Sequence, residues 1–460
     1  MWPRILFALS LAFWLWYWIV QRVLGPFGAD DTFFLHMFWM LKNGARQYTD
    51  FYSYHLPAYF ALITPLLPAG GDLGFAWWFR IMAVLIAAAY AAVTRPVLWP
   101  FLFAFLVFGR MTEIRPDTIG LLLFNFAWLM LLKGRPNRYA AAALSALALL
   151  FSARAAIMMI GMIILLLWLA RTDRRVILRL VSMGMAYLLV VAMVALAYPL
   201  WFETMLRSVF IDTVGLFPRM GVAERFLELE RLAMVGMIMA ALAAAAVAFW
   251  RDRSNGNAQV ITAACLSQMA LIFADPLPYG YVYGWAMIPT LAGLALAARL
   301  IGNKDRLLPL AAFGSALAML AVTLSYPLRN GPPAPDSFAR LTPIPRLPGE
   351  AISRATTPQL VALILRPRNP RDQLAVREEI CRRMSGTVAT HFWYQPVCMK
   401  DAMHNWIGQT WTRQELDRLI ATRPPQLIVW GAQPRWPDAL LDGYSEHPGF
   451  AIRNRPDRDR

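Results

Sequence analysis

The chain has 460 residues, of which 58% are hydrophobic and 16% charged, and its mean hydropathy is +0.46. Soluble globular domains are only about 45–50% apolar, so this composition excludes an ordinary soluble protein and indicates an α-helical polytopic membrane protein. The net charge of +16 comes from Lys and Arg residues spread over short loops between apolar runs. Because these residues do not gather on one face, a nucleic-acid partner is excluded and membrane lipids are expected instead.

The apolar residues fall into runs that predict membrane-spanning helices. The first run, residues 5–24, follows Arg4 and lacks a small-residue cleavage site, which indicates a retained signal anchor. Further runs occupy residues 75–94, 97–109, 116–132, 139–152, 155–170, 176–200, 232–250, 258–274, 285–300 and 307–326. We therefore expect about 11 spans, several of them shorter than the ~20 residues of a straight crossing.

Basic residues in the short loops set the expected orientation. They lie in alternate loops, at positions 95, 133–138, 171–175, 251–253 and 304–306. If the two short runs between Arg138 and Arg171 form a hairpin, these loops share one side, which the positive-inside rule makes cytoplasmic in a bacterial inner (plasma) membrane. The loops at 25–74, 110–117, 154, 201–231 and 275–284 and the C-terminal region are then outside, in the periplasm. Arg22 and Arg46 go against this rule.

The first outer loop, residues 25–74, is expected to carry two interfacial helices. Residues 32–43 have apolar side chains at helical spacing and Lys42 near the end, which is typical of a helix lying along the membrane surface. An Asn43-Gly44 turn follows. The next apolar stretch, residues 56–67, is punctuated by prolines and predicts a second interfacial helix rather than a span.

The composition divides the chain into a transmembrane region (1–326), a Pro-rich linker (327–349) and a small extracytoplasmic α/β domain (350–460). In the last part, helical patterns at 373–384 and 412–422 alternate with strand patterns at 387–392, 426–430 and 450–453. Cys381 and Cys398 either form a disulfide there or remain two free thiols. Together with Cys265 they show no spacing typical of a zinc site or a redox motif.

Several polar residues fall on the expected outer side, among apolar runs where a charge needs a partner or a purpose. They are Asp30, Asp31, Asp50, His55, Arg110, Glu113, Arg115, Asp117, Arg154, Asp275, Tyr279, Tyr281 and Tyr283. No nucleotide-binding loop, nucleophile elbow or zinc-protease motif occurs in the chain. The set suits the transfer of a sugar from a lipid phosphate, since a carboxylate can accept the proton of the acceptor and guanidinium groups can stabilise the departing phosphate.

Three features in order resemble one family. They are the acidic pair Asp30-Asp31 after the first span, the pattern G-x-x-x-Y-x-D-F-Y around Asp50, and Arg115-Pro116-Asp117 at the start of a span. This order resembles the GT-C membrane glycosyltransferases, most of all the family 39 and aminoarabinose-transferase-like branch. The resemblance implies a polyprenyl-phosphate sugar donor, a glycan, lipid or protein acceptor, an inverting displacement and a first-loop Asp as general base, here Asp30.

Many members of that family carry Asp-Glu where this chain has Asp-Asp. Either carboxylate is therefore a candidate for the base, and Asp30 and Asp31 either hold a divalent cation or act without one. Arg115 and Arg154 are the expected phosphate ligands, with Arg110 third, and Asp50, His55, Asp117 and Tyr281 complete the expected substrate site.

Each of these residues also has a simpler interpretation. Asp30 and Asp31 would cap a helix starting near Thr32, and Asp50 would belong to a turn. Arg154 would be an ordinary loop arginine, His55 a structural histidine, and Arg110 a partner of Glu113 in an ion pair. The tyrosines at 279, 281 and 283 would anchor the chain at the interface.

Two functions from other classes compete with a glycosyltransferase. A transporter or flippase has a similar composition, but transporters place ionisable residues near mid-membrane and show repeated halves, and neither is evident here. A non-catalytic envelope assembly protein would bind partners through the outer α/β domain and would not need the Asp30 to Asp50 residues.

Overall fold

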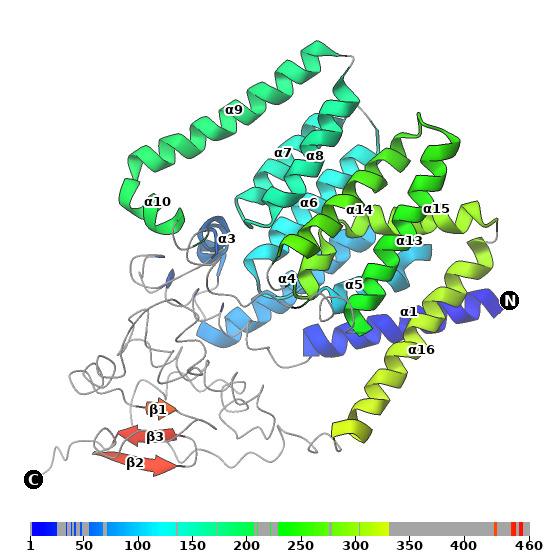
Figure 1. Ribbon diagram of the computed structural model, residues 1–460. Coiled ribbons are helices and arrows are strands. Elements are labelled where there is room, and N and C mark those ends of the chain that lie inside the picture. Colours follow the sequence, from blue (N-terminus) through cyan, green and yellow to red (C-terminus); the bar gives the residue numbers. More distant parts are fainter. Residues whose placement is uncertain are drawn as a thin grey trace, which may run out of the picture.

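A computed structural model describes the chain at residues 2–24, 34, 38, 41–42, 47, 55–67, 71–134, 137–171, 173–206, 209, 221, 229–275, 278–302, 304–330, 427–429, 443–447 and 450–453. The described part is mostly helical (Figure 1). Asp30, Asp31, Asp50, Cys381 and Cys398 lie outside these residues, as do the segments 373–384, 387–392 and 412–422. The predictions made for them stay predictions.

Each apolar run predicted as a span is helical in the structure. The main helices are α1 (Trp2–Trp18), extended by the π-helical η1 (Ile19–Leu24), then α4 (Gly71–Val93), α5 (Trp99–Phe108), α6 (Pro116–Leu132), α7 (Arg138–Leu149), α8 (Ala155–Ala170), α9 (Arg174–Ala197), α13 (Leu229–Arg251), α14 (Gly256–Ala274), α15 (Met287–Leu300) and α16 (Lys304–Asn330). Within the described residues, three helical segments are long and apolar enough to cross a membrane: Arg174–Ala197, Arg231–Arg251 and Gly256–Ala274. The expected number of 11 spans stays a prediction.

The helices pack around α5 and α6. All residues of α5 except the first are buried, as expected for a helix that is apolar on every side. Helix α6 packs against α7, α14 packs against both α8 and α13, and α1 packs against α5 and α16. Large aromatic side chains fill the contacts: Trp128 and Trp285 both pack on Phe124, with ring centroids 5.7 and 5.8 Å away.

Helix α9 differs from the rest because it stands apart from the bundle (Figure 1). Val176, near its start, is its one buried residue, and apolar side chains such as Leu188 and Leu189 are exposed. Such a surface suits lipid rather than water. The helix ends before Pro199, which lacks the backbone N–H needed to continue it, and α10 (Pro199–Leu206) begins there. The segment that we expected to be a loop from residue 201 therefore starts as a helix.

Helix α7 connects the polar and basic ends of the bundle. Its first residue, Arg138, forms an ion pair at 3.6 Å with Asp173, the N-cap of α9, so the basic loops at 133–138 and 171–175 share one end. At the other end, Ser152 after α7 donates a hydrogen bond to Asp117 in the first turn of α6. This arrangement agrees with the alternation of loops read from the sequence.

The described residues between α1 and α4 pack through aromatic side chains. Phe34 and Phe38, one helical turn apart, are buried against Phe60 of α3 (Ala58–Ile63), with ring centroids 6.3 and 5.3 Å away. The short η2 (Thr64–Leu66) follows α3. The prediction of a second short helix in this loop is confirmed, and together α3 and η2 are too short to span a bilayer.

The C-terminal region contributes three described strands: β1 (Leu427–Val429), β2 (Tyr444–His447) and β3 (Phe450–Arg453). They form an antiparallel sheet in the order β1-β3-β2, with Ile428 opposite Ala451 and Glu446 opposite the same residue on the other side. Two of the predicted strands are confirmed, and β2 is additional. Helix α16 continues through Asn330, past the predicted domain boundary at residue 326.

Candidate functional site

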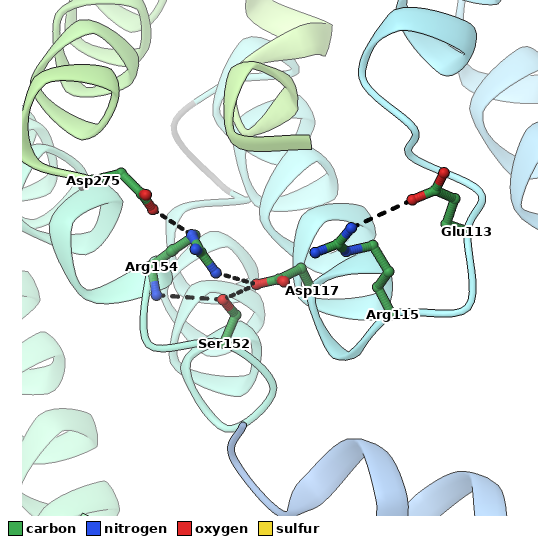
Figure 2. A network of polar contacts seen from close by, with 6 residues as sticks. All are labelled: Glu113, Arg115, Asp117, Ser152, Arg154 and Asp275. Carbon is green, nitrogen blue, oxygen red and sulfur yellow. Dashed lines mark hydrogen bonds and ion pairs between the residues drawn. The ribbon is translucent and has the colours of Figure 1, made fainter. Parts of the chain in front are cut away.

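Polar residues from four separate helix ends meet at the end of the bundle opposite the basic loops. They include Arg115, Asp117, Arg154 and Tyr281 of the predicted site, joined by Glu113 and Asp275 from the predicted outer side and by Arg22 and Ser152. Figure 2 shows six of them: Glu113, Arg115, Asp117, Ser152, Arg154 and Asp275. The residues form two groups. We call them the Arg154 cluster (Asp117, Ser152, Arg154 and Asp275) and the Glu113 cluster (Arg22, Arg110, Glu113 and Arg115).

In the Arg154 cluster, one guanidinium lies between two carboxylates. Arg154 Nε donates to Asp275 Oδ2 at 2.5 Å, and its Nη1 lies 3.5 Å from Asp117 Oδ1 (Figure 2). Ser152 donates its hydroxyl hydrogen to the same Asp117 oxygen and accepts the backbone N–H of Arg154 at 3.3 Å. Both carboxylates are buried, and among the described residues the two carboxylates and one guanidinium give this cluster a formal charge of minus one.

Local structure explains why these residues meet. Asp117 follows Pro116 in the first turn of α6, where a carboxylate is favoured by the helix dipole. Arg154 is the residue before α8, and Asp275 is the residue after α14. Since α8 packs against α14, the end of one helix and the start of the other bring Arg154 and Asp275 together. Burial alone would lower the pKa of the Arg154 guanidinium, whereas Tyr281, Asp275 and Asp117 raise it, so the side chain stays charged.

In the Glu113 cluster the balance is reversed, because among the described residues three guanidinium groups surround one carboxylate. Glu113 lies 2.7 Å from Arg22, 3.5 Å from Arg115 and 3.9 Å from Arg110. Burial alone would raise the pKa of the Glu113 carboxyl, but Arg22, Arg110 and Arg115 hold it below its ordinary value. Glu113 is therefore ionised, and the four described residues of this cluster have a formal charge of plus two.

Tyr281 lies between the clusters. The guanidinium carbon of Arg115 is 3.8 Å from the centroid of its ring, and that of Arg154 is 5.0 Å away. Both distances are typical of cation–π contacts. Burial raises the pKa of the Tyr281 hydroxyl, which therefore remains protonated at neutral pH. The ring is fully inside the protein rather than at an interface, so the structure favours a positioning role over the simple membrane anchor that its sequence position also allowed.

Two buried amides hold the segment that carries Tyr281, η6 (Gly280–Gly284). Gln268 of α14 donates to the carbonyl of Val282 at 2.6 Å and accepts the N–H of Ala286. Asn125 of α6 donates to the carbonyl of Gly284 and accepts the N–H of Ile288, both at 2.9 Å. Gly280 is needed here because a Cβ would lie 2.1 Å from the Phe108 carbonyl oxygen.

His55 and Arg110 stand at the margins of the site. His55 is buried against Phe34, and its carbonyl accepts a hydrogen bond from Gln47 at 3.1 Å. Burial lowers the pKa of His55 to about 3, against the opposing effect of Asp117, so the imidazole is neutral at physiological pH. Arg110 is the most exposed member of the Glu113 cluster, with 46% of its side chain accessible.

Arg22 and Ser152 are the members of the clusters that the sequence interpretation did not include. Arg22 did carry a signal, since it breaks the positive-inside rule at the end of the first span. The ion pair with Glu113 explains why an arginine lies at this end of the span. The neighbouring residues are also joined, because the Trp18 indole N–H donates to the Thr112 hydroxyl at 3.2 Å. Ser152 carried no such signal, because its role depends on the packing of α7 against α6.

The site offers no metal centre in the part of the chain that the structure describes, where no three His, Cys, Asp or Glu side chains gather. Asp30 and Asp31, the predicted cation ligands, lie outside that part. A comparison of the chain with protein-family models, with curated proteins and with solved structures found no match.

Proposed function

We propose that the chain is a membrane glycosyltransferase that moves a sugar from a polyprenyl-phosphate donor to a glycan, lipid or protein acceptor on the outer face of the bacterial inner membrane. One observation carries this proposal: four arginines and three carboxylates, mostly buried, meet at one end of a bundle of apolar helices. Placing charged groups beside hydrocarbon costs desolvation free energy, and ion pairing alone would not require so many of them.

The two clusters suit the two parts of such a donor. The surplus of positive charge around Glu113 favours the lipid phosphate, with Arg115 and Arg110 as its principal ligands. The Arg154 guanidinium is already engaged by Asp117 and Asp275, so we assign it to fixing the site rather than to binding the phosphate first. One oxygen of Asp117, Oδ2, is buried without a hydrogen-bond partner among the described residues and suits a sugar hydroxyl.

The reaction itself would use the carboxylates of the first outer loop. In the proposed step the acceptor oxygen or nitrogen attacks the anomeric carbon of the sugar, and its proton passes to Asp30. The bond between the anomeric carbon and the phosphate oxygen breaks, and the lipid phosphate leaves with one more negative charge, which Arg115 and Arg110 stabilise. Asp30 follows Arg22 of the Glu113 cluster by eight positions in the sequence. Asp31 orients Asp30 or holds a divalent cation.

Membrane topology supports the same proposal. The basic loops at 133–138 and 171–175 share the end opposite the polar clusters, which is the arrangement that the positive-inside rule gives for an outward-facing site. The 11 expected spans and an α/β domain at 350–460 complete the proposed architecture. The resemblance to GT-C glycosyltransferases, through the Asp30-Asp31 pair and Arg115-Pro116-Asp117, points to the same donor class.

The test is a transfer assay with the full chain purified in detergent. Polyprenyl-phosphate sugars of several types are incubated with envelope extracts as acceptors, and release of polyprenyl phosphate is followed together with labelling of the acceptor. We expect at least one donor to be consumed by the wild type and not by Asp30→Asn. If no donor is bound or consumed, and reconstituted vesicles instead show movement of a lipid or solute, the transporter alternative replaces this proposal.

A further inference from the structure

Glu113 occupies a position that a simple phosphate site would not need. An anion site gains affinity from free guanidinium groups, yet here a buried carboxylate lies among three of them, at 2.7, 3.5 and 3.9 Å. Its charge opposes any second anion at the same place. Its side chain is only 6% exposed, so solvent screens this opposition weakly.

The three arginines are bound unequally. Arg22 has the shortest contact and is 13% exposed, so it is the firm partner of Glu113. Arg110 has the longest contact and is 46% exposed, which makes it the one that an incoming anion can most easily recruit. The backbone of Arg110 has a φ of 46°, in the left-handed region that costs a non-glycine residue energy. In this conformation the Arg110 side chain lies 3.9 Å from Glu113.

We propose that Glu113 is a built-in competitor of the phosphate, which limits how tightly the Arg110 and Arg115 side chains hold an anion. This inference rests on the proposed function. A donor phosphodiester carries one negative charge, whereas the lipid phosphate left after transfer is a monoester that carries up to two. The positive charges of Arg22, Arg110 and Arg115 would retain this product strongly, while the carboxylate of Glu113 offers Arg115 and Arg110 an alternative partner and allows its release.

The competing interpretation is that Glu113 only cross-links Arg22, Arg110 and Arg115 and so holds the site in shape. The two interpretations predict opposite results for removal of its charge. If Glu113 competes, Glu113→Gln strengthens anion binding. If Glu113 only positions the arginines, the same change weakens it.

The experiment measures the dissociation constant of farnesyl phosphate, a short prenyl monoester, for the full chain in detergent. We expect Glu113→Gln to bind about tenfold more tightly than the wild type and Arg22→Gln about tenfold more weakly, since each changes the charge beside the anion by one unit. The double variant restores the charge balance and should return to within about threefold of the wild type. Asp275→Asn, which removes a carboxylate from the Arg154 cluster, is the matched control and should strengthen binding less.

If Glu113→Gln alone does not purify as a folded protein, the affinities of Arg22→Gln and of the double variant are compared instead. If Glu113 competes with the anion, adding Glu113→Gln to Arg22→Gln recovers the affinity that Arg22→Gln has lost. A double variant that binds no better than Arg22→Gln, or a folded Glu113→Gln that binds no better than the wild type, overturns the inference and leaves the proposed function standing. No binding of farnesyl phosphate by the wild type overturns both.

Discussion

The Glu113 and Arg154 clusters are built from the same residue types but have opposite charge. Around Glu113, three arginines face one carboxylate, whereas Arg154 is shared by Asp117 and Asp275. The ring of Tyr281 contacts an arginine of each. The difference teaches that an arginine near a candidate site is not in itself an anion ligand: its carboxylate partners decide whether charge is left over to bind one.

The largest expected effect separates the chemistry from both clusters. Asp30→Asn keeps the shape of the side chain but removes the proton acceptor, so sugar transfer should fall by a factor of about 10²–10⁴. Binding of the donor should persist, because the proposed phosphate ligands, Arg115 and Arg110, lie in the Glu113 cluster. Transfer rate and donor affinity are measured on the same preparation.

Asp31→Asn is the control for that prediction and should reduce transfer less. Near-normal transfer by Asp30→Asn would make Asp31 or Asp50 the base, or would return the acidic pair to the role of a helix cap.

The next prediction compares the two arginines that contact Tyr281. Arg115→Ala should weaken binding of a prenyl phosphate by about 10–100-fold, the value of a hydrogen bond to a charged group. Arg154→Ala should instead lower the free energy of unfolding by about 3 kcal/mol, because it leaves Asp117 and Asp275 buried without their shared partner. Affinity and thermal unfolding in detergent are measured for both variants. The opposite pattern, with affinity lost only in Arg154→Ala, would exchange the roles of the clusters.

A smaller effect is expected from the residue that positions Tyr281. Asn125→Ala removes the amide that pairs with the carbonyl of Gly284 and the N–H of Ile288. Each of these buried backbone groups then lacks a partner, and the unfolding free energy should fall by about 2–4 kcal/mol. Ser145→Ala removes a buried hydroxyl that donates to the carbonyl of Ala142 within α7, away from η6, and is a suitable control. Unchanged stability of Asn125→Ala would show that the packing of Trp285 alone holds η6.

The smallest effect is a pH dependence at His55, which is influenced by charges from both clusters. Burial lowers its pKa from about 6.5 to about 3, so below pH 6.5 the unfolded chain binds a proton that the folded chain excludes. The folded state should therefore lose about 1.4 kcal/mol per pH unit, or about 2 kcal/mol between pH 6.5 and pH 5. His55→Gln should remove this part of the acid sensitivity. An unfolding profile with the same slope in both proteins would contradict the neutral, buried state of His55.

Much of the fold could be predicted from the sequence because it depends on local patterns. Apolar runs define the helices, and Pro116 marks the start of α6. The start of α10 at Pro199 was missed, because residues 176–200 form one apolar run. The short strand β3 was also predicted with its observed bounds. By contrast, β2 reads Tyr-Ser-Glu-His, a segment with little apolar alternation, and its pairing with β3 is a tertiary property.

The candidate site could be predicted only in part. Residue type and expected side of the membrane indicated Arg115, Asp117 and Arg154. The charge balance of each cluster depends on contacts between residues far apart in the chain, such as Arg22 with Glu113 and Arg154 with Asp275. No local pattern contains these pairs, so the sequence alone ranked Arg154 with Arg115 as a phosphate ligand.

The central claim, that the outer end of the bundle binds a lipid phosphate at the Glu113 cluster, is tested most directly by a structure of the full chain with polyprenyl phosphate in a lipid nanodisc. We predict that the phosphate contacts the guanidinium groups of Arg115 and Arg110 on the Glu113 side of Tyr281, with the isoprenoid chain leaving toward the bilayer. A phosphate bound to Arg154 beside Asp117 and Asp275, or a site without lipid at saturating concentration, would contradict the account.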